Sequence, residues 1–214
     1  MSGILDLLNS DIGKSIVSGV SEQTNQPQNK THDVLTMAMP VLMAAMQRNA
    51  SSPEGAQGLL SALNNKHDGS ILNNLSGLFG GGGVDNNVME DGSKILGHVL
   101  GNKQSNVEKA IGAKAGVDAG SVAQILKVAA PILMGMLGNQ AKQQNVNSPS
   151  GLEGMLGGLL KGSSPKGDQS FLESILDANN DGSIMDDVAG MVMGGNKKKG
   201  GLGGIIGGLF GGKN

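Results

Sequence analysis

An apolar stretch centred on a proline occurs twice in this chain and is the feature that most constrains the fold. The first copy spans residues 34–46 and the second spans residues 125–137, with Pro40 and Pro131 at equivalent positions. A stretch that is apolar nearly all round is typical of a helix buried on most sides. A proline inside it either kinks that helix or occupies the first turn of a second one. We therefore expect two related units, each built on a central helix.

Other segments are paired in the same order. Residues 52–55 (Ser-Pro-Glu-Gly) match residues 148–151 (Ser-Pro-Ser-Gly), and both read as a helix cap followed by a proline in the first turn. Residues 63–71 match residues 176–184, and the two segments share an Asp-Gly-Ser-Ile sequence. Insertions of loop size between helices that keep their order indicate a duplicated helical unit. No clear alternating apolar run is present, so the sequence predicts an all-α protein.

Changes in composition divide the chain into four parts. Consecutive glycines at 80–83 predict a flexible linker, and residues 196–214 are a low-complexity tail rich in Lys and Gly. Residues 21–33 are polar, contain Pro27 and predict a loop, while Ser10 and Asp11 predict a helix cap. The predicted parts are a first helical unit (1–79), a Gly linker (80–83), a second helical unit (84–195) and a flexible tail (196–214).

The composition excludes several classes of protein. The 214 residues include no Cys, no Trp and no Tyr, but 12 Met and 37 Gly. The absence of Cys removes disulfides, thiol nucleophiles and Cys-ligated zinc. A net charge of −2 provides no basic field for nucleic acid, and few aromatic side chains are present on which bases could stack. The Met content predicts an adaptable core or docking surface.

The apolar stretches and the N-terminal sequence indicate where in the cell the protein is expected. Each stretch falls short of the ~20 residues that a membrane-spanning helix needs. The N-terminal sequence Met-Ser-Gly-Ile-Leu-Asp has no basic region followed by a long apolar run, so it lacks a standard secretory signal. We expect no transmembrane span and a cytoplasmic location. A signal-less export route would leave no mark in the sequence.

The sharpest local motif is a partial calcium loop that begins at Asp177. Oxygen-bearing residues occupy its positions 1, 3 and 5, Gly182 occupies position 6, and a backbone carbonyl falls at position 7. The residues that would surround a weakly bound calcium ion are Asp177, Asn179, Asp181, Ser183, Asp186 and Asp187.

The second half of this loop departs from the calcium pattern. Val188 stands at position 12, where a bidentate Glu is expected, and the matching loop of the first unit has Asn64 and Lys66 at ligand positions. The alternative interpretation is an Asp-Gly turn in which Asp181 or Ser183 caps the following helix. Calcium binding by this loop therefore remains an alternative to the interpretation as a turn and helix cap.

No catalytic set is evident in the sequence. The three histidines, His32, His67 and His98, lack the spacing of a zinc motif and favour isolated surface or cap positions. The glycines at 80–83 are not followed by the Lys-Ser/Thr of a phosphate loop. We expect no enzyme activity and no resident cofactor.

The tail predicts either a docking arm or a solvated segment. Lys197, Lys198 and Lys199 would meet anionic headgroups while the apolar residues Leu202, Ile205, Ile206, Leu209 and Phe210 enter the membrane surface or a partner. The alternative is a disordered tail, because few apolar side chains are available to offset the entropy of ordering.

Several segments together resemble a known family. They are the opening Met-Ser-Gly-Ile-Leu-Asp-Leu-Leu, residues 95–101 (Ile-Leu-Gly-His-Val-Leu-Gly), residues 130–135 (Ala-Pro-Ile-Leu-Met-Gly), the Asp-Gly-Ser at 181–183 and the Gly-Leu-Phe-Gly of the tail. These segments resemble the bacterial YidB-like family of unknown function ("DUF nine-three-seven"). The resemblance implies a small α-helical fold and no assigned activity, so no catalytic residue is carried over.

The sequence favours a non-enzymatic helical interaction or scaffold protein that binds a protein partner or itself. Two alternatives remain open. One is a weak calcium-binding protein that uses residues 177–187, and the other is a protein that associates with a membrane surface through its tail.

Overall fold

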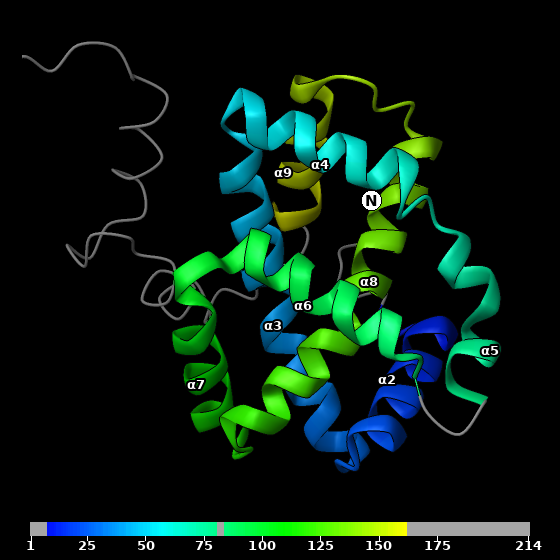
Figure 1. Cartoon of the computed structure of the whole chain (residues 1–214), viewed down its shortest axis with the longest axis vertical. Helices are drawn as coiled ribbons and strands as arrows, with labels where there is room; N and C mark the ends of the chain where they lie inside the picture. The colour runs from blue at the N-terminus through cyan, green and yellow to red at the C-terminus, as the bar shows by residue number, and fades with distance from the viewer. Residues whose placement is uncertain (1–7, 81–83, 162–214) are drawn as a thin grey trace, which may run out of the picture.

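The structure is a computed structural model that describes residues 8–80 and 84–161. Every regular element in these residues is helical, which confirms the all-α prediction (Figure 1). The predicted calcium loop and the tail lie outside the described residues. The elements are α2 (Asp11–Thr24), α3 (Gln28–Ala50), α4 (Pro53–Asn65), η1 (Ser70–Asn74), α5 (Leu75–Gly80), α6 (Asn86–Leu100), η2 (Gly101–Lys103), α7 (Gln104–Ala115), α8 (Ala119–Gln143) and α9 (Pro149–Lys161).

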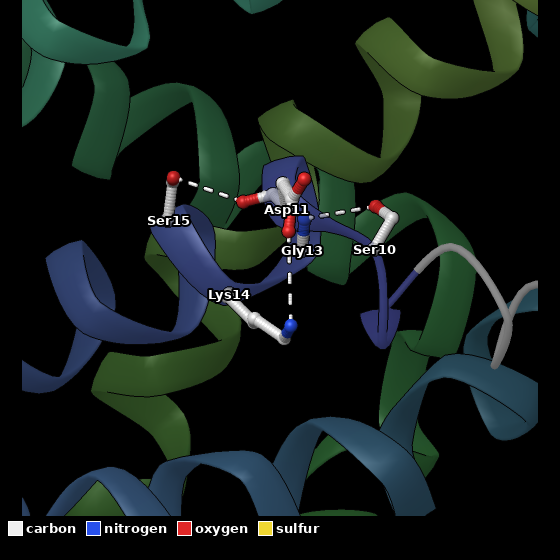
Figure 2. Close-up of polar contacts among 5 residues, drawn as sticks. All are labelled: Ser10, Asp11, Gly13, Lys14 and Ser15. Atoms are coloured by element: carbon white, nitrogen blue, oxygen red, sulfur yellow. Dashed lines mark hydrogen bonds and ion pairs between the residues drawn. The ribbon is translucent and has the colours of Figure 1, made fainter.

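The start of helix α2 confirms the predicted cap at Ser10 and Asp11. Figure 2 shows the Ser10 hydroxyl accepting a hydrogen bond from the Gly13 backbone N–H, at 3.2 Å. Asp11 then lies in the first turn, where a negative charge suits the helix dipole, and its side chain is 3.7 Å from the Lys14 ammonium. The Ser15 hydroxyl donates to the Asp11 carbonyl at 3.0 Å.

The ends of the helices repeat between the two units. Asn25 follows α2 and Gly116 follows α7 as the C-terminal cap, and both of these residues have the left-handed backbone that commonly closes a helix. The Asn25 φ angle is 52° and the Gly116 φ angle is 65°. α3 and α8 begin three residues after these caps, at Gln28 and Ala119. The duplication seen in the sequence is therefore also a duplication of local structure.

The two Ser-Pro segments also form the same cap. Both α4 and α9 span 13 residues and begin with proline, whose missing N–H costs nothing in the first turn. Ser52 Oγ accepts from the Gly55 N–H at 3.1 Å, and Ser148 Oγ accepts from the Gly151 N–H at 3.2 Å. This prediction is confirmed in both units.

The predicted loop over residues 21–33 is wrong, because α2 and α3 extend into it and leave only residues 25–27 between them. The polar residues of this stretch bond within the fold without breaking the helices. The Thr24 hydroxyl donates to the Val20 carbonyl at 2.7 Å, and the Ser21 hydroxyl donates to the Gln26 carbonyl. A polar composition was therefore a poor guide to the helix boundaries here.

Both prolines lie within continuous helices, so the alternative that they begin second helices is wrong. Pro40 and Pro131 are inside α3 and α8, and both are buried. A proline in a helix leaves the carbonyl four residues earlier without its N–H partner. In α8 this carbonyl belongs to Lys127, and Gly92 of α6 packs directly against it.

The two units interlock around one core. α3 of the first unit packs against α7 and α9 of the second, and α8 packs against α2 and α4 of the first. α3 and α8 also contact each other, and α6 lies along α8 (Figure 1). The fully buried large side chains of the central helices include Leu35, Leu42, Met43, Met46, Ile125, Leu126, Ile132 and Leu133. Each central helix is therefore covered partly by the other unit.

Helix α8 is the one described helix whose length and apolar composition would allow it to cross a membrane. Its apolar window is 67% buried inside the fold. The core helix of a globular domain has the same properties, and its packing against α2, α4, α6 and α7 accounts for them here.

The glycines of α6 provide a matched test of this packing. A Cβ at Gly92 would overlap the Lys127 carbonyl, whereas a Cβ at Gly97 would meet nothing within 4 Å. We expect Gly92→Ala to lower the free energy of unfolding by about 1–3 kcal/mol, the usual cost of overpacking. Gly97→Ala should leave it unchanged or raise it by up to ~1 kcal/mol through helix propensity. Urea unfolding of both variants checks this, and equal effects would contradict the α6–α8 contact.

Candidate functional site

A pocket of about 410 Å³ opens where the segment after α4 meets η1, α6 and α8. Its volume lies within the ~300–1,000 Å³ range of ligand sites. The lining combines apolar side chains with charged groups of both signs and one histidine. The lining residues are Lys66, His67, Ser70, Ile71, Asn87, Val88, Glu90, Asp91, Lys94 and Pro131.

One wall of the pocket is the segment 66–71, which is seated on α8 through glycines of that helix. A Cβ at Gly138 would overlap the His67 carbonyl, and a Cβ at Gly135 would overlap the Ile71 side chain. Gly69 has a φ of 97°, a left-handed conformation that a side chain would strain. Small residues on α8 and in the turn therefore allow the two backbones to approach closely.

The negatively charged side chain of Asp68 holds the segment 66–71 against α8. Its carboxylate accepts a hydrogen bond from the Lys142 ammonium at 2.9 Å and another from the Ser70 backbone N–H at 3.1 Å. The hydrogen bonds from Lys142 and then from Ser70 hold the pKa of Asp68 well below its ordinary value. In the first unit, the Asp-Gly-Ser sequence therefore forms a turn in which Asp68 bonds to the N–H two residues later.

This turn bears on the calcium prediction for the second unit. In the first copy, the aspartate stabilises a turn by accepting a backbone hydrogen bond. No group of His, Asp or Glu in the described part of the chain has the arrangement of a metal site. The six predicted ligands at 177–187 lie beyond α9, outside the described residues. Calcium binding by them stays a prediction.

His67 lines the pocket, whereas the sequence favoured an isolated surface or cap position for it. The side chain is only 8% exposed, and its Nε2 lies 3.6 Å from the Asp91 carboxylate on α6. Burial lowers the pKa of His67 and outweighs the effect of Asp91, which raises it, while nearby Lys66 lowers it further. The imidazole therefore binds a proton less readily than an ordinary histidine does. His32 on α3 and His98 on α6 do not line this pocket.

At the rim of the pocket, Glu90 and Lys94 form an ion pair one turn apart on α6. Their side chains are 2.7 Å apart and mostly exposed to solvent. Their hydrogen bond lowers the pKa of Glu90 and raises that of Lys94. An exposed pair of this kind adds little stability, but its two charges compensate each other at the pocket mouth.

The polar groups of the pocket contact one another or acidic residues just outside the lining, such as Asp68 and Asp85. The Ser70 hydroxyl hydrogen-bonds to Asp68, and the His67 ring faces Asp91. Activating a serine nucleophile would require the Ser70 hydroxyl to bond to the imidazole instead. The arrangement suits the binding of a small group better than the transfer of a proton from serine.

The pKa of His67 provides a direct test of this geometry. We expect NMR titration of the His67 ring to give a pKa below the ordinary value of about 6.5. Asp91→Asn should lower this pKa further, and Lys66→Gln should raise it. Since the unfolded chain binds the proton more readily, stability should be fully present above pH ~6.5 and should fall as the pH drops below it. An increase of the His67 pKa in Asp91→Asn would contradict the assigned contact.

Comparison with known proteins gives one match. The model of a family described as "Bacterial protein of unknown function (DUF937)" matches residues 6–140 and again residues 141–214. The match in two segments agrees with a duplicated chain. No curated protein and no solved structure matches.

Proposed function

We propose a non-enzymatic interaction or scaffold role for this chain, which belongs to the DUF937 family of bacterial proteins of unknown function. The observation that carries the proposal is the interlocked core. Each central helix is covered by helices of the other unit, so the two copies form one platform. We propose that this platform acts in the cytoplasm and binds a protein partner or a second copy of itself.

The lining of the pocket supports a docking role. Ile71, Val88 and Pro131 provide apolar surface, while charged groups surround them. Binding sites commonly combine an apolar lining with a few polar groups that orient the ligand. A side chain of a partner could therefore be held here without any chemical step.

The basic tail is the second element of the proposed role. Lys197, Lys198 and Lys199 precede the apolar residues of the tail and would serve as an arm that contacts a partner. A membrane surface is the alternative target, since a polybasic segment next to apolar residues also binds anionic lipid. Calcium binding by residues 177–187 is a separate alternative, and the Asp68 turn does not favour it.

Deleting residues 196–214 tests the division between platform and arm. We expect the melting temperature to change by less than a few degrees, because the interlocked core lies upstream of the deletion. Crosslinking of the full chain in a bacterial lysate should yield a protein partner, or a second copy, that the deleted chain does not yield. Thermal unfolding and mass spectrometry measure the two effects.

A matched variant separates the proposed partner from a membrane. Replacing Lys197, Lys198 and Lys199 with Gln keeps the length of the tail and removes its charge. If this variant loses binding to anionic phospholipid vesicles and no protein partner is found for the full chain, the membrane alternative replaces the proposal. A fall of many degrees in melting temperature on deletion would contradict the separation of arm and platform.

A further inference from the structure

The size and apolar surface of the pocket set the scale of what it can bind. A volume of about 410 Å³ is near the lower end of the ~300–1,000 Å³ range for ligand sites, which leaves room for a small molecule. Pro131 is buried, while Ile71 and Val88 are partly buried and pack against the core. These three side chains offer a small apolar surface to a bound molecule.

Among the charged residues that line the pocket, Glu90 pairs with Lys94. One negative charge, Asp91, and one positive charge, Lys66, are left outside this pair. Lys94 makes its short contact with Glu90, although Asp91 is near enough to raise the pKa of Lys94 as well. The Asp91 carboxylate lies 3.6 Å from the His67 Nε2, and it forms no ion pair with a Lys or Arg in the described part of the chain. Lys66 is exposed and makes no ion pair with any residue that the structure describes.

His67 locates these two charges with respect to each other. The Asp91 carboxylate lies 3.6 Å from the His67 Nε2, and Lys66, which precedes His67 in the chain, lines the same pocket. A neutral imidazole carries one N–H donor and one nitrogen acceptor. It can therefore accept from an ammonium group or donate to a carboxylate held beside it.

We propose that this pocket binds a small zwitterion with an apolar side chain, such as a free α-amino acid of the leucine type. Its ammonium group pairs with Asp91, its carboxylate pairs with Lys66, and its side chain lies against Ile71, Val88 and Pro131. A ligand with only a positive charge would be repelled by Lys66, and a ligand with only a negative charge would be repelled by Asp91. A free amino acid would occupy the pocket in place of the partner side chain considered above, and its binding does not depend on the proposed scaffold role.

Three ligands that share one carbon skeleton test the proposal on the full chain. L-leucine carries both charges, leucine amide carries only the positive charge, and 4-methylpentanoate carries only the negative charge. We expect leucine to perturb the amide signals of Ile71 and Val88 in NMR titrations. We expect the other two ligands to bind at least about tenfold more weakly, because each loses a charge-assisted hydrogen bond.

Variants of the two charged residues test the same contacts from the protein side. Asp91→Asn and Lys66→Gln should each weaken leucine binding by about tenfold. Asp33→Asn on α3 and Lys109→Gln on α7 are exposed, lie away from the pocket and should leave the affinity unchanged. Val88→Trp fills the pocket and should abolish binding, and amide spectra of each variant establish that it is folded.

Several results would overturn the proposal. One is equal affinity for leucine amide and leucine, which would indicate a cation site. Another is equal affinity for 4-methylpentanoate and leucine, which would indicate an anion site. The absence of any perturbation at about 10 mM leucine would exclude binding with a Kd tighter than roughly 1 mM. Retained binding in Val88→Trp would place the ligand elsewhere.

Discussion

The mutual burial of α3 and α8 is the constraint on which the rest of the structure depends. The central stretches of both helices, residues 34–46 and 125–137, are apolar nearly all round, so neither helix can lie on a surface with one face in water. Each touches the other, packs against helices of its own unit and is also covered by helices of the opposite unit. Burying one large aliphatic side chain contributes about 1.5–3 kcal/mol, and the core contains several such side chains from each helix. The interlocked arrangement therefore follows from the duplicated apolar stretch.

The burial of α3 and α8 also relates the prolines inside these helices to the glycines that pack in the core. A proline inside a helix costs about 3 kcal/mol when the helix is isolated, and it frees one carbonyl. In α8 the freed carbonyl of Lys127 lies against Gly92, whose lack of a side chain lets α6 approach it closely. Gly135 and Gly138 on the same helix admit the segment 66–71, which builds the pocket wall. Small residues on α6 and α8 thus position the site.

Local sequence signals predicted the elements better than they predicted the site. The caps followed from local patterns, Ser-Asp at Ser10 and Ser-Pro at Ser52 and Ser148, because the bonds that form a cap join neighbouring residues. The loop assigned to residues 21–33 was wrong because polar residues there bond back to their own helices. The contact between His67 and Asp91 joins α6 to the segment after α4, and no local pattern marks a tertiary contact of that kind. The Asp-Gly-Ser-Ile sequence shared by the two units drew attention to Asp68 and Gly69 but not to the neighbouring His67.

Native-state hydrogen exchange with increasing denaturant tests most directly whether the two units form one interlocked core. The measurement compares the slowest-exchanging amides of α3, such as Leu35 and Leu42, with those of α8, such as Ile125 and Leu133. If the units depend on each other, both sets exchange with the same free energy and the same dependence on denaturant, which is the signature of one cooperative unfolding event. If one central helix opened at a lower free energy with a smaller denaturant dependence, that unit would unfold while the other remained folded, and the interlocked core would be contradicted.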